Sequence, residues 1–245
     1  MKYLFLALNF LTIVPVSVKG EIRPGDLGRS GFWFPVIGLF IGSCVYGIGQ
    51  GVETLFSPGL SALIMTVVWV AMTGGLHLDG LADCCDGLLH PSTKERRLEI
   101  MKDSRIGAFG VVGLILFLLL KIMLVNDLLI EESYLPILLG PALGRWFILI
   151  SAKQPLAKLS GMGVDFAQGI NYPLILVSGI LPLGIAVLMG YRGILAIIFS
   201  AILVAGIHSF SRSRIGGVTG DILGLIIELV EVAVMLGCLL IGKLI

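Results

Sequence analysis

Three aspartates gather in one short stretch of a chain that otherwise carries little charge. Asp79, Asp83 and Asp86 stand four and then three residues apart, so on an α-helix they would lie within roughly 60° of one another as one acidic stripe. Three carboxylates this close repel each other, and a bound divalent cation is the simplest reason for their coexistence. Oxygen ligands favour Mg²⁺ or Mn²⁺ over Zn²⁺. The spacing therefore predicts a metal site formed by these three aspartates.

A histidine precedes this acidic stripe, and its role is open at this stage. His77 lies about 160° from Asp79 on the same helical wheel, which leaves either a contact with substrate or a capping or packing role. Gly74 and Gly75 would end the preceding apolar helix and let a ligand approach the backbone. The alternative for the whole stretch is a solvated, charge-rich loop. The apolar residues between the aspartates favour the metal site, because they follow a helical period.

A second polar segment, residues 101–110, comes just before an apolar run. Lys102 and Arg105 suit phosphate oxygens, Lys as a point charge and Arg as a planar fork. Asp103 is the candidate general base, on its position alone, and His77 is the other candidate for proton removal. The alternative is an ordinary basic flank of a membrane helix. The acidic stripe nearby favours phosphate contact.

A glycine-rich segment, residues 211–221, follows a later apolar run and contains two arginines. It matches no P-loop or dinucleotide fingerprint. Arg214 is nevertheless predicted to contact a phosphate of the substrate.

Several ionisable residues fall inside or beside apolar runs. They are Asp221, Glu228, Glu231, Arg145 and Lys121. Charged side chains within a bilayer are costly and usually face a polar interior, so the three acidic residues and Arg145 are predicted to support the site or to pair there. Arg145 either reaches the cytosolic interface or pairs with Glu228 or Asp221. Lys121 is placed near the outer end of its run, where snorkelling explains it without a role.

The composition indicates an integral membrane protein. The chain is 57% hydrophobic and 13% charged, with a mean hydropathy of +1.03, against about 25% charged residues in soluble proteins. Seven apolar runs can cross a hydrocarbon core of about 30 Å, and the apolar stretch 3–18 crosses, re-enters or lies in the interface. We predict an all-α, polytopic bundle of about seven transmembrane helices plus this N-terminal segment, forming one catalytic domain over residues 1–245. The seven runs are residues 33–52, 58–78, 108–125, 134–152, 173–189, 193–209 and 222–242.

Basic residues alternate between the loops, and this alternation predicts the orientation. Most of the 17 Lys and Arg residues lie in one set of loops, whereas the opposite set contains only Arg192. Because basic loops stay in the cytosol, the first set and the acidic stripe are expected on the cytosolic face of a prokaryotic inner membrane. The first set comprises residues 19–30, 79–107, 153–172 and 210–221, and the second 53–57, 126–133 and 190–192.

The remaining composition limits the partners. A net charge of +1 gives no indication of a nucleic-acid partner. The four cysteines lack CxxC spacing and are predicted to be free thiols. The 33 glycines suit close helix packing in lipid, so a homodimer in the bilayer is an open expectation.

Together these features predict a magnesium site at the cytosolic face of a helical bundle, beside cations suited to a polyphosphate. The chemistry that fits is phosphoryl or nucleotidyl transfer. A spare carboxylate or His77 would take the proton of an attacking hydroxyl. The membrane location indicates a large or lipid-like substrate.

Several strings of the sequence resemble the cobalamin synthase family. They are ALNFLTIVPV (7–16), the pair Phe34–Pro35, GGLHLDGLADCCDGL (74–88), MKDSRIGAFG (101–110) and RIGGVTGDILG (214–224). The resemblance implies the last assembly step of the cobalamin nucleotide loop. In that step α-ribazole, or its 5′-phosphate, attacks adenosylcobinamide-GDP and gives adenosylcobalamin, or its 5′-phosphate, with release of GMP. The resemblance also implies a requirement for Mg²⁺.

Two other functions stay open on the residues alone. A CDP-alcohol phosphotransferase would require the motif D-x-x-D-G-x-x-A-R. Asp83, Asp86 and Gly87 fit its opening, but residues 88–91 are Leu-Leu-His-Pro. An ion-coupled transporter would use Glu228, Glu231 and Arg145 as an intramembrane relay, but it leaves the acidic stripe without a purpose.

Overall fold

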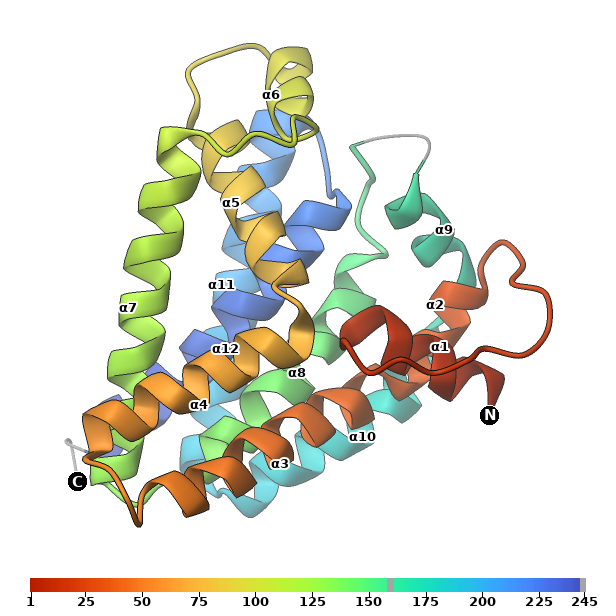
Figure 1. The fold of residues 1–245 in the computed structure, drawn as a ribbon. Coiled ribbons are helices and arrows are strands. Elements are labelled where there is room, and N and C mark those ends of the chain that lie inside the picture. Colours follow the sequence, from red (N-terminus) through yellow and green to blue (C-terminus); the bar gives the residue numbers. More distant parts are fainter. Residues whose placement is uncertain (158–160, 243–245) are drawn as a thin grey trace.

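The computed structural model describes residues 1–157 and 161–242, and the regular elements in these ranges are helices (Figure 1). The predicted all-α class is therefore confirmed, with one isolated parallel bridge between Leu156 and Val218. In chain order the elements are α1 (Lys2–Leu11), α2 (Asp26–Ser30), the short 3₁₀ helix η1 (Gly31–Trp33), α3 (Phe34–Val52), α4 (Pro58–Thr73), α5 (Leu76–Leu89), α6 (Lys94–Ile100), α7 (Ala108–Ile130), α8 (Leu135–Ser151), α9 (Met162–Gly169), α10 (Tyr172–Leu188), α11 (Tyr191–Ile215) and α12 (Gly220–Gly242).

Proline and glycine set many of the helix boundaries. A proline stands in the first turn of α3, α4, α8 and α10, where its missing N–H is not needed. Gly74 ends α4 and Gly216 ends α11, at φ of +61° and +86°. This left-handed conformation carries little strain in glycine. Each predicted apolar run overlaps one of the long helices α3, α4, α7, α8, α10, α11 and α12.

The helices of the described chain do not confirm the predicted number of membrane spans. By length and composition, α7, α11, α12 and the combined segment Asp26–Val52 can each cross a membrane. The pairs α4 with α5 and α9 with α10 qualify only as bent units, at 91° and 92°. These helices make four to six spans in the described chain, so the count of about seven is not confirmed. The predicted run 134–152 forms a helix of only 17 residues, and run 58–78 breaks after Thr73.

The bend between α4 and α5 positions the acidic stripe. Gly74 and Gly75 both have positive φ, and together they turn the chain so that α5 rises between α7 and α12 (Figure 1). The crossing of α5 and α12 is close because it is made at glycines. A Cβ on Gly80 would lie 2.9 Å from the backbone oxygen of Asp221. This contact brings Asp221 next to Asp79 in the fold.

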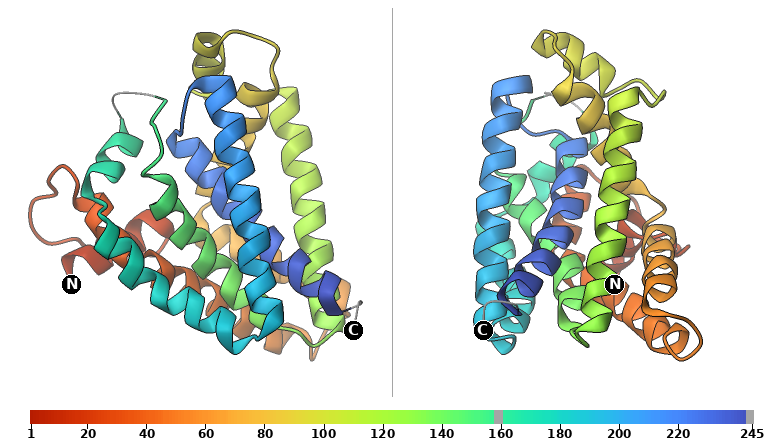
Figure 2. Two further views of the ribbon diagram at one scale, coloured as in Figure 1. Left: turned by 180° about the vertical axis from the view of Figure 1, so that it is seen from behind. Right: turned by 90° about the vertical axis from the view of Figure 1, so that its left-hand side faces the viewer.

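The centre of the bundle is formed by α8 and α12, whose side chains are mostly buried. Figure 2 shows α12 running between α11 and α7. The connections before α7 and between α11 and α12 lie at one end of the molecule, and the α3–α4, α7–α8 and α10–α11 connections lie at the other (Figures 1 and 2). The basic segments 101–107 and 210–221 are therefore separated in space from segments 53–57, 126–133 and 190–192, whose only basic residue is Arg192. Lys158, one of the basic loop residues, lies outside the described residues.

Candidate active site

The acidic stripe lies on α5, as the spacing predicts, and two of its three carboxylates share a pocket. Asp79 and Asp83 line a pocket of about 700 Å³ between α5, the 101–107 loop and α7. Lys102, Asp103 and Ser104 line the same pocket. The structure thus brings the first two predicted metal ligands together with one of the predicted phosphate contacts.

The third aspartate of the stripe has a different environment. Asp86 is 9% exposed, and its carboxylate accepts hydrogen bonds from the backbone N–H groups of Gly107, at 2.7 Å, and Gly110, at 2.9 Å. These amides belong to the first turn of α7, which has no partners of its own for them and favours a nearby negative charge. A side chain at Gly110 would collide with the carboxylate. Asp86 therefore joins α5 to the start of α7.

The positions of the three aspartates decide which of them can hold one metal ion. Among the described residues, no group of three or more His, Cys, Asp or Glu side chains is placed to hold a metal ion. The helical rise separates Asp79 from Asp86 by roughly 10 Å along α5. Mg²⁺, however, is usually held by one or two carboxylates together with water and substrate phosphates. Asp79 and Asp83 fit that requirement, and a metal role for Asp86 stays a prediction.

The predicted base Asp103 is engaged by its neighbour. Arg105 donates from Nε and Nη2 to the Asp103 carboxylate, at 3.0 and 2.7 Å, and its backbone N–H donates to the same group. The Arg105 hydrogen bonds lower the pKa of Asp103 from its usual 3.8 to about 2. A carboxylate with so low a pKa is a poor proton acceptor near neutral pH. This arrangement disfavours Asp103 as the general base.

The three residues predicted to contact phosphate lie in different places. Lys102 is exposed and faces the pocket that contains Asp79 and Asp83. Arg105 lines a separate pocket of about 550 Å³ that also contains Asp86. Arg214 lies at the end of α11, where its guanidinium stacks 5.2 Å from the ring centre of Phe210. The structure therefore brings Lys102, and neither arginine, beside the Asp79 and Asp83 pair.

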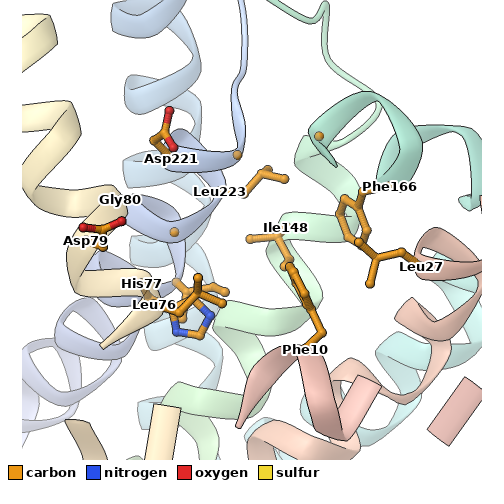
Figure 3. A pocket seen from close by; sticks show the side chains of 14 residues that line it. Phe10, Leu27, Leu76, His77, Asp79, Gly80, Ile148, Phe166, Asp221 and Leu223 are labelled. Carbon is orange, nitrogen blue, oxygen red and sulfur yellow. The ribbon is translucent and has the colours of Figure 1, made fainter. Parts of the chain in front are cut away.

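A second pocket, of about 240 Å³, shares Leu76 and Asp79 of the first turn of α5 with the larger pocket (Figure 3). His77, Asp79 and Asp221 line one side of it, and the opposite side is apolar and aromatic. His77 is only 3% exposed, and neither of its ring nitrogens has a hydrogen-bond partner among the described residues. The apolar and aromatic side comprises Phe10, Leu27, Ile148 and Phe166. No sequence pattern predicts this side of the pocket, because its members come from four separate helices.

The ionisable residues within the bundle form one buried network. Lys121 Nζ donates to Oε2 of both Glu228, at 2.9 Å, and Glu231, at 2.6 Å. Arg145 Nη1 donates to Glu231 Oε1 at 2.8 Å. Arg145 therefore pairs with Glu231, and not with Glu228 or Asp221 as the sequence predicts. The interpretation of Lys121 as a snorkelling residue is wrong, since its side chain is 1% exposed and lies 4.3 Å from the ring centre of Trp69.

Asp221 and the four cysteines lie outside the buried network. The Asp221 carboxylate accepts a hydrogen bond from Thr219 Oγ1 at 3.1 Å and lies apart from the buried network, at the same pocket as Asp79. The four cysteines, all within the described ranges, are free, as predicted.

Comparisons with known proteins agree over nearly the whole chain. A family model described as cobalamin-5-phosphate synthase matches residues 3–239. An adenosylcobinamide-GDP ribazoletransferase of Pseudomonas fluorescens is 37% identical over 95% of this chain and 97% of its own. Proteins of the same name from Clostridium botulinum and Brevibacillus brevis are 34% and 35% identical, over 94% of each chain. No solved structure matches.

Proposed function

This chain belongs to the cobalamin-5-phosphate synthase family and is an enzyme with adenosylcobinamide-GDP ribazoletransferase activity in cobalamin nucleotide-loop assembly, and from that premise we propose where and how the reaction runs. The two reactants are adenosylcobinamide-GDP and α-ribazole or its 5′-phosphate, and both reactants bind at the two pockets beside α5. The reaction depends on Mg²⁺. The site faces the cytosol, on the evidence of the basic loops around it.

One observation carries the proposal: Asp79 lines both pockets. Because Asp79 belongs to both linings, groups bound in the two pockets would meet at the Asp79 carboxylate. The larger pocket suits the diphosphate of the donor, because it presents Lys102 beside Asp79 and Asp83. The smaller pocket, which is largely apolar, suits the acceptor.

The proposed step is a displacement at phosphorus. A hydroxyl oxygen of the acceptor bonds to the phosphorus that carries the corrinoid alcohol, and the bond from that phosphorus to the oxygen of GMP breaks. The chemistry that Mg²⁺ supplies when bound by Asp79 and Asp83 is neutralisation of charge on the diphosphate and on departing GMP. Lys102 adds a positive charge on the same side.

The hydroxyl proton requires an acceptor at the junction of the pockets. Asp103 is disfavoured by its bonds to Arg105. Asp221 replaces it as the candidate, because it lines the acceptor pocket together with Asp79 and its backbone packs against Gly80, the residue after Asp79. The proton would pass from the acceptor hydroxyl to this carboxylate.

The test is GMP release by purified protein supplied with both substrates. Omitting Mg²⁺, or introducing Asp83→Asn, is expected to lower the rate at least about a hundredfold, because charge neutralisation at phosphorus is lost. Glu99→Gln on α6 is the matched control, since Glu99 is exposed and its contact is a surface pair with Arg96 at 2.8 Å. Near-normal turnover of folded Asp83→Asn protein would refute the proposed site.

The transporter alternative loses its main support. Glu228, Glu231 and Arg145 form a neutral, buried network with Lys121, which gives them a role in holding the helices together. The CDP-alcohol alternative is disfavoured by the family to which the chain belongs.

A further inference from the structure

The smaller pocket is built for a flat, mostly apolar ligand. Phe10 and Phe166 line it, and both rings stack on Phe34, with ring centres 5.9 and 5.5 Å from it and planes within 19° and 15°. The stack is buried at Phe34 and fixes the two outer rings in place. Rings held in this way offer an apolar surface to an aromatic group.

One polar side chain in this pocket has no partner. His77 is 97% buried, lines the pocket, and has no hydrogen bond at either ring nitrogen among the described residues (Figure 3). A buried polar group without a partner is costly, and such groups in native proteins require a reason. A ligand that brings one hydrogen-bonding atom to an otherwise apolar surface would supply it.

We propose that this pocket binds the base of the acceptor nucleoside, with His77 donating a hydrogen bond to the unsubstituted ring nitrogen of that base. The base of α-ribazole is a benzimidazole, which is flat and apolar and has one free ring lone pair. Asp79 and Asp221, which also line this pocket, then accept hydrogen bonds from the ribose hydroxyls, and Asp79 is shared with the pocket proposed for the donor diphosphate. Neutral imidazole has one N–H to donate, so a single acceptor atom is matched.

The same pocket would reject guanine, the base of the donor. Guanine brings an amide and an amino group, and the apolar side of the pocket would leave these groups without partners. The inference rests on the proposed function for the identity of the acceptor, but it assigns the two bases to different places.

The experiment changes the free ring nitrogen of the acceptor and the His77 side chain, each alone and both together, and compares the four combinations. The acceptor is supplied as the benzimidazole ribonucleoside or as its indole analogue, in which the free ring nitrogen is replaced by C–H. The wild-type protein and His77→Leu are each compared with both acceptors. KM for the acceptor and for adenosylcobinamide-GDP are measured separately, and binding of each nucleoside is measured without donor.

Wild-type protein is expected to favour benzimidazole over indole by about tenfold, the value of one hydrogen bond with its desolvation. His77→Leu should lose that preference while KM for the donor stays unchanged, and His77→Gln, which retains an N–H donor, should recover part of it. An equal preference in wild-type and His77→Leu proteins, or none in wild type, would overturn the proposal.

A second variant tests the pocket without changing His77, in case the His77 variants fail to fold. Leu223→Phe narrows the pocket without changing His77, and it should raise KM for the acceptor alone. An unchanged KM for the acceptor in this variant would also count against the pocket. Because nucleoside binding is measured without donor, failure of this inference can be distinguished from failure of the proposed function. Binding that depends on His77 without GMP release would refute only the proposed function, and GMP release without dependence on His77 would refute only this inference.

Discussion

Replacing Lys121 by Met tests whether the buried network holds the bundle together. The Met side chain has a similar length and no charge, so it removes the ammonium and leaves the packing largely intact. Lys121 is the cation that contacts Glu228, whereas Glu231 also receives Arg145. The variant therefore changes the network from neutral to a net charge of −1 and leaves Glu228 without its cation.

The expected cost follows from these contacts. Removing one partner of a buried ion pair costs about 3–5 kcal/mol, because the remaining charge stays buried. The ammonium also lies 4.3 Å from the ring centre of Trp69, a contact worth up to about 2 kcal/mol when desolvated. We expect Lys121→Met to lower the free energy of unfolding by about 3–5 kcal/mol. Adding Glu228→Gln should restore at least about half of the loss, since it removes the uncompensated charge.

The assay is reversible unfolding of the purified protein in mixed micelles, followed by fluorescence and circular dichroism. Trp69 is buried beside Lys121, so its fluorescence reports the neighbourhood of the change. Lys102→Met is the matched control, because Lys102 is exposed, and it should change the unfolding free energy by less than about 0.5 kcal/mol. A Lys121→Met protein within about 1 kcal/mol of wild type would refute the structural role of the network.

Two further predictions concern the loop between α6 and α7. Asp86→Ala removes the acceptor of two backbone hydrogen bonds at the start of α7 and should cost about 2–3 kcal/mol of unfolding free energy, measured in the same assay; Asp86→Asn, which keeps one carbonyl oxygen, should cost less, and equal stabilities would contradict the capping role. Arg105→Gln removes the hydrogen bonds that lower the pKa of Asp103, so this pKa should rise from about 2 toward 3.8, measured by NMR titration of the carboxyl carbon. The stabilisation from this pair is present above pH 4 and lost as the pH falls toward 2, and an unchanged titration would contradict the assignment.

The sequence is sufficient to predict the long helices and some of their ends, because these depend on local features. Apolar runs indicate the helices, and the glycines at positions 74 and 216 end them where the structure requires positive φ. The pocket that contains His77 follows no local rule. Phe10 and Phe166 are far apart in the chain and come together only because both stack on Phe34.

The helical wheel predicts that the three aspartates of the acidic stripe share one face, but it does not predict that they contact different neighbouring helices. Asp79, Asp83 and Asp86 do point from one face of α5, yet the axial rise places the last about two turns beyond the first. What lies opposite each carboxylate depends on the neighbouring elements. Asp86 meets the first turn of α7, whose amide groups require an acceptor. Asp79 instead meets α12, through the close contact of Gly80 with Asp221.

The depth of Lys121 shows why a charge cannot be placed from its own helix alone. The predicted apolar run ends at residue 125, where Asn126 and Asp127 follow, and this end puts Lys121 close to the interface. The helix continues to Ile130 because Leu128 and Leu129 are buried against other helices. Lys121 thus lies well inside α7, where a lone ammonium would be costly. The two glutamates of α12 offset that cost, so the position of the lysine is set by residues more than a hundred positions further along the chain.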